Sequence, residues 1–250
     1  MLRLSVAATW NQTAADWHRI LALSPGLCWG IEVDGQLAAT ATAIVYGDKL
    51  AWIGMVLTLP EFRGQGLARR LIAHLIDQLR NQNIQSIKLD ATTMGAPLYR
   101  EFGFQEERPI ERWFRPGINR IFDNTGTWDP SLDTTATGVS RLHLLNALAR
   151  ESAIWATVDG SFAMLRPGAN ASYLGPILAR NAESAKQLLA ALPPDAAAYW
   201  DLFPEHSEAR SLATQLGFKP ARQLLRMSLG NNIPNSNLQF QFGIAGFEYG

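Results

Sequence analysis

The sequence predicts an α/β (α+β) fold with two mixed-sheet units in tandem, and three features of the 250-residue chain carry this prediction. An alternating apolar stretch at residues 28–57 contains the turn signals of an antiparallel meander. An amphipathic helical pattern begins at residue 67 and leads into a strand pattern at 84–91. The same order of elements returns, in weaker form, in the second half of the chain.

Turn residues divide the first half into its elements. Asp34-Gly35 and Gly47-Asp48 predict two hairpin turns between the three strands of the meander. After the meander, apolar residues recur at the i, i+4 spacing of one helical face: Leu67, Ala68, Leu71, Ile72, Leu75, Ile76 and Leu79. A short helix is expected through residues 98–102, closed by Gly103, with a last strand at 111–114.

The middle of the chain has the composition of a connector. Residues 115–138 are rich in Gly, Pro, Asp, Asn and Thr and lack clear periodicity. We therefore expect an N-terminal domain at residues 1–118, a linker at 119–137 and a C-terminal domain at 138–250.

The second half of the chain repeats the order of elements of the first half but has fewer candidate functional residues. Leu-Gly-Phe at 216–218 echoes Phe-Gly-Phe at 102–104, and YLGPILA at 173–179 echoes WIGMVLT at 52–58. The first copy then has a turn rich in arginine and glycine, whereas the second runs from strand into helix without one. The C-terminal domain is therefore expected to be a degenerate copy.

Charge and composition exclude several classes of function. The 22 Lys and Arg residues balance 22 Asp and Glu residues, so no nucleic acid or anionic membrane partner is expected. Since no apolar run approaches the roughly 20 residues that span a bilayer, and no signal-peptide pattern opens the sequence, we expect a soluble cytoplasmic protein. The single cysteine, Cys28, and the four scattered histidines offer no metal-ligand spacing, so no metal is expected.

The turn at residues 61–70, EFRGQGLARR, predicts a site for a dense anion. Helix N-termini have unpaired amides and a partial positive charge, which disfavours arginine in the first turn unless an anion binds there. Arg69 and Arg70 nevertheless occupy it, with Arg63 just before it. Gly64 and Gly66 allow the backbone to approach a phosphate or pyrophosphate closely.

The spacing of this turn disfavours two common phosphate ligands. The dinucleotide pattern GxGxxG needs a third glycine at position 69, where Arg69 stands. The nucleoside triphosphate loop GxxxxGK[ST], counted from Gly64, needs Gly-Lys at positions 69 and 70, where both residues are arginine. NAD, ATP and GTP are therefore not expected.

Residues 63–68 resemble the R-x-x-G-x-A form of the acyl-CoA pyrophosphate motif in the GNAT N-acetyltransferase superfamily. The strand at 52–57, the strand that ends at 89–92, and Tyr99 with Gly103-Phe104 stand in the order of that family. The sequence further resembles bacterial tandem-GNAT proteins, whose second acetyltransferase domain is diverged; the similar segments are Trp10–Thr13 with Asp16-Trp17, Leu174–Pro176 and Ile244–Gly250. Only nine residues precede Trp10, so the family's first strand is expected to be missing or replaced.

The resemblance implies roles for particular residues. It assigns the acyl and pantetheine portion of acetyl-CoA to the backbone at Met55, Val56 and Leu57, where Gly54 suits a bulge or a close backbone approach. It assigns the pyrophosphate to the turn: Arg63, Gly64, Gln65, Gly66, Leu67 and Ala68. Tyr99 matches the tyrosine that protonates the departing thiolate, and the aligned residue of the second copy is Ala213.

The general base is left open by the sequence. Glu32, Asp48 and Asp90 lie near predicted strand ends, but an exposed carboxylate explains each of them better than a base does. Trp10, Asp16 and Trp17 suit a substrate wall, although an amphipathic helix that buries two tryptophans explains them almost as well. Asp201 and His206 carry the same ambiguity.

The resemblance favours an acyl-CoA-dependent N-acyltransferase, with acetyl-CoA as donor and a primary amine of a small molecule or peptide as acceptor. The alternatives are a non-catalytic acyl-CoA sensor and an interaction protein that keeps only the fold. The C-terminal domain, which lacks the turn and the tyrosine, is expected to cover the amine site rather than bind CoA. The sequence does not identify the amine or the oligomeric state.

Overall fold

The structure is a computed structural model that describes residues 1–119, 128–231 and 236–250. The first half contains α1 (Leu2–Ala7), α2 (Ala14–Leu23), β1 (Cys28–Val33), β2 (Gln36–Tyr46), β3 (Leu50–Thr58), α3 (Leu67–Asn81), β4 (Ser86–Ala91), α4 (Ala96–Glu101) and β5 (Gln105–Arg115). The second half contains α5 (Ser131–Thr137), α6 (Leu142–Ala149), β6 (Ala153–Ala156), β7 (Phe162–Arg166), β8 (Ser172–Leu178), α7 (Ala182–Leu189), β9 (Ala198–Leu202), α8 (Ser207–Gln215), β10 (Lys219–Gly230) and β11 (Gln241–Gly243).

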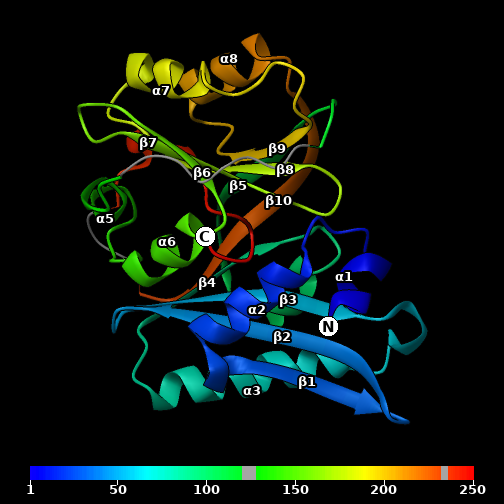
Figure 1. Cartoon of the computed structure of the whole chain (residues 1–250). Coiled ribbons are helices and arrows are strands. Elements are labelled where there is room, and N and C mark those ends of the chain that lie inside the picture. Colours follow the sequence, from blue (N-terminus) through cyan, green and yellow to red (C-terminus); the bar gives the residue numbers. More distant parts are fainter. Residues whose placement is uncertain (120–127, 232–235) are drawn as a thin grey trace.

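The strands of the described residues form one continuous sheet rather than two separate ones. Its order is β1-β2-β3-β4-β10-β5-β9-β8-β7-β6, with β11 paired to β8. The two halves therefore exchange their last strands: β10 lies between β4 and β5, and β5 lies between β10 and β9. Figure 1 shows β5 and β10 in the middle of the molecule, between the blue first half and the yellow second half. This exchange makes each half a structural part of the other.

Helices cover the outer parts of the sheet. Helix α3 packs the apolar face predicted from its sequence against the meander, with Leu71, Leu75 and Leu79 buried. Helix α2 lies on the opposite face of the meander and starts with a capping box between Thr13 and Asp16. In the second half, α7 and α8 lie on one face of the sheet (Figure 1).

Most of the predicted elements are confirmed. The Asp34-Gly35 turn joins β1 to β2 with positive φ angles of 51° and 75°, and Gly103, at a φ of 89°, follows α4. The mixed α/β fold class is likewise confirmed.

Two segments outside the main predicted elements contain helices. Within the linker predicted at 119–137, residues 131–137 form helix α5, because Leu132 and Ala136 are buried in the core. Residues 120–127 of that linker lie outside the described residues, and the domain bounds stay a prediction. At the start of the chain, helices α1 and α2 precede β1, which is the first strand described, as the expectation of a missing or replaced first strand requires.

Candidate active site

Strands β3 and β4 separate and leave a gap in the sheet. Their parallel pairing consists of three residue pairs and ends at Trp52 and Lys88, although β3 continues to Thr58 and β4 to Ala91. A cavity of about 850 Å³ opens at this gap, and its walls come from both halves of the chain. Strand β3 therefore splays from β4 beyond Trp52.

A bulge in β3 turns two consecutive amides into the gap. Strand β2 pairs Thr40 with Leu57 and Thr42 with Gly54, so Met55 and Val56 together lie opposite the single residue Ala41, and Met55 has a φ of 50°. The hydroxyl of Thr40 donates to the Met55 carbonyl at 2.9 Å, and that of Thr42 donates to the Gly54 carbonyl at 3.1 Å.

These two hydrogen bonds fix the direction of the amides. Because N–H and C=O point in opposite directions across a trans peptide, carbonyls held toward β2 leave the N–H groups of Met55 and Val56 directed away from β2. Successive peptides of a regular strand alternate in direction, so two neighbouring amides on the same side are a product of the bulge. Two such donors can stabilise an oxyanion that develops between them.

The turn before α3 has the conformation that its glycines predict. Gly64 and Gly66 have φ angles of 77° and 73°, and a Cβ atom on either would meet no atom within 4 Å. Gly66 is the N-cap of α3, no side chain caps the helix, and its first turn has no acidic residue. The first amides of α3 lack partners within the helix, and Gly66, Leu67 and Ala68 line the cavity, an arrangement that suits phosphate oxygens.

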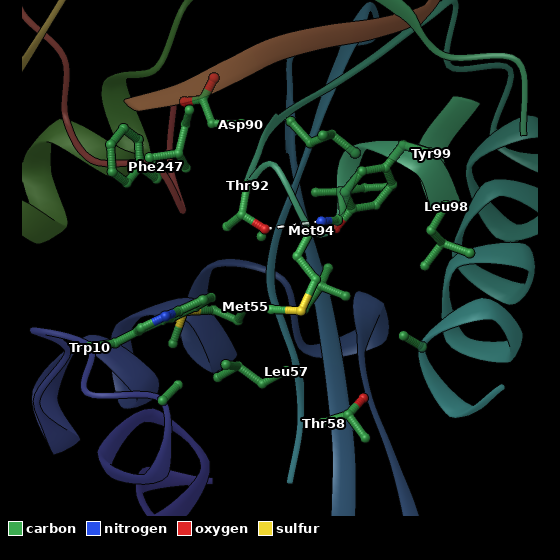
Figure 2. Close-up of a pocket in the computed structure, with 18 of the residues that line it drawn as sticks. Trp10, Met55, Leu57, Thr58, Asp90, Thr92, Met94, Leu98, Tyr99 and Phe247 are labelled. Carbon is green, nitrogen blue, oxygen red and sulfur yellow. Dashed lines mark hydrogen bonds between the residues drawn. The ribbon is translucent and has the colours of Figure 1, made fainter. Parts of the chain in front are cut away.

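Tyr99 projects from α4 across the cavity from Leu57, as Figure 2 shows. The short helix is positioned by Thr92, whose hydroxyl accepts a hydrogen bond from the Gly95 amide at 3.0 Å. The Tyr99 side chain is buried, and this burial raises its pKa above the ordinary value of 10. The phenol is therefore protonated at neutral pH and can act as a proton donor.

The cavity brings together all but one of the residues that the resemblance assigns to acetyl-CoA binding and catalysis. Its walls include Met55, Val56, Leu57, Arg63, Gly64, Gly66, Leu67, Ala68 and Tyr99. Gln65 is the exception, because its exposed side chain does not line the cavity. The roles of these residues in binding and catalysis stay predictions.

Part of the cavity wall consists of residues to which sequence reasoning gave no role. Figure 2 shows Trp10 and Phe247 at one side of the cavity and Leu98 at the other. The wall also includes residues from β5, β10 and the 244–250 segment: Arg112, Arg222, Gln223, Leu224, Phe247 and Glu248. The sequence contained no local signal for them, since only the fold brings these segments to the same place.

None of the three carboxylates considered as general bases is both unpaired and in the cavity. Asp90 lines the cavity, but its fully buried side chain binds Arg226 through two hydrogen bonds of 2.9 and 3.0 Å. Glu32 and Asp48 are exposed and lie away from the cavity. Of the expected substrate wall, Trp10 lines the cavity, whereas Asp16 is buried in an ion pair with Arg19.

The corresponding gap in the second half is filled by the chain itself. Strands β8 and β9 also pair over three residue pairs. Beyond them, β11 pairs with β8, and the Phe242 carbonyl accepts a hydrogen bond from the indole of Trp200 at 2.8 Å. A Cβ atom on Gly175 would lie 2.2 Å from the Ile244 carbonyl oxygen. Residues 241–244 thus occupy the space that is open between β3 and β4.

Two further features are absent from the described residues. No group of three or more His, Cys, Asp or Glu side chains there is arranged to hold a metal ion. None of the described helices is long and apolar enough to cross a membrane.

Removing the Thr40 hydroxyl tests the role of the bulge. Thr40→Val is expected to lower kcat by about 5-fold, because one hydrogen bond of about 1 kcal/mol no longer fixes the peptide that carries the Val56 amide. The dissociation constant of acetyl-CoA should change little. The control is Thr137→Val, which removes hydroxyl bonds to the Asp133 and Val139 carbonyls far from the cavity. Equal losses of kcat in both variants would contradict a positioning role for Thr40.

Two sequence profiles match the chain one after the other. The profile described as "Acetyltransferase (GNAT) family" matches residues 4–104, and that described as "Acetyltransferase (GNAT) domain" matches residues 130–243. The chain is also 26% identical over 239 residues to the "Uncharacterized N-acetyltransferase YitH" of Bacillus subtilis, across 87% of this chain and 83% of that protein.

Solved structures show the same fold. A proposed acetyltransferase from Pyrococcus horikoshii superposes with a TM-score of 0.84 at 22% identity, over 94% of this chain and 84% of its own. A tandem GNAT protein from the clavulanic acid biosynthesis pathway superposes with a TM-score of 0.59 at 11% identity, over 91% of this chain and 92% of its own.

Proposed function

Because the chain belongs to the GNAT family of N-acetyltransferases and contains two regions of that family in tandem, we propose that it transfers an acyl group from acyl-CoA to a primary amine. The expected donor is acetyl-CoA, and the expected acceptor is an amine of a small molecule or peptide. Transfer would occur by direct attack while both substrates are bound. We place the reaction in the cytoplasm, with no nucleic acid or membrane as partner.

The observation that carries the proposal is the pair of amides at the β3 bulge, next to a helix N-terminus that has no capping side chain. The amides of the 63–68 turn would bind the pyrophosphate of the donor. The gap between β3 and β4 would take the pantetheine arm, since its apolar walls exclude water. The amides of Met55 and Val56 would stabilise the developing oxyanion, and Tyr99 would protonate the departing thiolate.

A thermal shift with acetyl-CoA tests the site of binding. At 100 times the dissociation constant, ligand should add about 2.7 kcal/mol, or about 5–10 °C in melting temperature. Gly66→Glu should abolish this shift, because it adds bulk and negative charge where the pyrophosphate would bind.

Gly47→Glu is the matched control. Gly47 is also exposed, has a similar positive φ of 63°, and has no atom within 4 Å of a built Cβ. Both variants therefore carry similar backbone strain, and only Gly66→Glu should lose the acetyl-CoA shift. A shift that persists in Gly66→Glu, or is absent from the wild type, would contradict the proposal.

A further inference from the structure

The 244–250 segment brings a carboxylate to the bulge of β3. A Cβ atom on Gly54 would lie 2.9 Å from the Cα of Glu248 and 3.0 Å from its carbonyl oxygen. The backbone of Glu248 therefore rests on β3 one residue before Met55, which carries the first of the two inward amides. Glu248 is among the residues that line the cavity from this position.

The Glu248 carboxylate is buried and only partly paired. The Gln12 amide donates to one oxygen at 3.1 Å, and Arg166 lies 3.5 Å from the other. Arg166 makes its shorter hydrogen bonds with the carbonyls of Gly175 at 3.0 Å and Ala245 at 2.8 Å. Burial raises the pKa of Glu248 above its usual value, against the lowering effect of Arg166. This carboxylate can therefore accept a proton or hold an ammonium group.

The cavity wall also contains a cation, Arg222. Arg222 on β10, Arg112 on β5 and Asp201 on β9 are direct cross-strand neighbours. Asp201 neutralises Arg112 through two hydrogen bonds of 2.8 and 2.7 Å. Arg222 makes no hydrogen bond or ion pair with any described residue, and desolvation and Arg112 lower its pKa. The Arg222 side chain is exposed, so its charge is free to bind an anion that enters the cavity from solvent.

We propose that the acceptor is an amine that also carries a carboxylate, a free amino acid or a close analogue, with its ammonium group at Glu248 and its carboxylate at Arg222. This inference rests on the proposed acyl transfer. A polyamine would place a second cation beside Arg222 and Arg112, so it fits this end of the cavity poorly. The acceptor subsite thus consists of side chains from β10 and the 244–250 segment, both from the second half.

The protons and electron pairs balance over the acyl transfer step. The ammonium group gives one proton to Glu248, and the freed lone pair of nitrogen forms the C–N bond at the thioester carbonyl carbon. The C–S bond breaks with its electron pair on sulfur, and the thiolate takes the Tyr99 proton. The nitrogen then returns a second proton to the Tyr99 phenolate, and Glu248 releases its proton to solvent. The products are an N-acyl amino acid and free CoA thiol.

The test is an acceptor panel with acetyl-CoA as donor. It contains the common L-amino acids, β-alanine and 4-aminobutyrate, each beside its carboxamide, and putrescine. Release of CoA thiol and the mass of the acetylated product are the readouts. At least one free acid should exceed its carboxamide by 10-fold or more in kcat/KM.

Two variants separate the two contacts. Arg222→Gln should raise KM for the acid by at least 10-fold, with little change in kcat, and should remove the preference for acid over amide. Its control is Arg210→Gln, because Arg210 is exposed and lies outside the cavity.

Glu248→Gln should lower kcat by about 100-fold or more and keep the acetyl-CoA thermal shift, which also verifies folding. Glu32→Gln is its control.

The pH profile separates a proton acceptor from a structural carboxylate. The charged groups around Glu248 are Arg166 on β7, Asp16 on α2 and Arg112 on β5. Since the pKa of Glu248 is raised, the rate should fall as pH decreases through a value above 4.5, and Glu248→Gln should lose this acid limb.

Three results would overturn the inference: no free amino acid is acetylated, acids and amides react equally, or Arg222→Gln weakens acetyl-CoA binding instead of acceptor binding. These results are distinct from failure of the proposed function. If acetyl-CoA binds and Gly66→Glu prevents binding, yet no amino acid is acetylated, the acyl transfer proposal stands and the acceptor class is wrong.

Discussion

Tyr99→Phe is expected to lower kcat by about 10²- to 10⁴-fold while the dissociation constant of acetyl-CoA stays the same. The phenol makes no hydrogen bond with any described residue, so the substitution removes a proton donor and keeps the buried ring, which packs 5.9 Å from the ring of Phe104. Stability should therefore change little. The measurement is CoA thiol release under saturating acetyl-CoA, with binding followed by calorimetry.

Tyr199→Phe is the control, because Tyr199 does not line the cavity and its hydroxyl is also unbonded among the described residues. It should retain full turnover. A kcat for Tyr99→Phe within threefold of the wild type would remove Tyr99 from the mechanism. A protein that only senses acyl-CoA would bind it and release no thiol with any amine, in the wild type as in both variants.

Asp201→Ala is expected to reduce the free energy of unfolding by about 3–5 kcal/mol. The Asp201 side chain has no exposed surface and accepts hydrogen bonds from Arg112 and, at 2.9 Å, from the hydroxyl of Tyr173. Its loss leaves the largely buried guanidinium of Arg112 without a counter-charge at the junction of β5 and β9. Denaturation in urea, followed by circular dichroism, measures the change.

A double variant separates the lost charge from the lost side chain. Replacing both partners, as Arg112→Met with Asp201→Leu, should recover most of the stability, since no charge is then left buried without a partner. Asp48→Ala, at an exposed carboxylate, should stay within about 0.5 kcal/mol of the wild type. A loss below 1 kcal/mol for Asp201→Ala would show that this pair does not hold the two halves together.

The features near the 63–68 turn could be predicted from the sequence because local rules determine them. Gly64 and Gly66 require positive φ angles in a tight turn, and the apolar spacing after Gly66 determines the buried face of α3. The glycine at position 54 likewise indicated a close backbone approach. The structure adds the identity of the approaching residue, Glu248, which lies 194 positions further along the chain.

The exchange of β5 and β10 could not be predicted from the sequence. Each strand has the pattern of a half-buried strand, and nothing in that pattern states which neighbour it pairs with. The acceptor end of the cavity depends on this exchange, because Arg112 and Arg222 meet across it. The side chains of the candidate acceptor subsite were missed for the same reason.

The degenerate second half was predicted from what its sequence lacks, and the structure supplies a physical reason. Ala213 is fully buried on α8 and offers no proton donor at the position that corresponds to Tyr99. The gap between β8 and β9 is closed by β11, with Gly175 in close contact with Ile244. The chain then continues to Glu248 at the open gap, so the segment that closes one gap also forms a wall of the other.

A crystal structure of the protein with acetyl-CoA tests the central claim most directly. The account predicts one acetyl-CoA per chain, with its pyrophosphate on the amides of the 63–68 turn and its thioester carbonyl oxygen within hydrogen-bond distance of the Met55 and Val56 amides. Strand β11 should stay in place between β8 and β9. Acetyl-CoA bound between β8 and β9 with β11 displaced, or bound away from both gaps, would contradict the account.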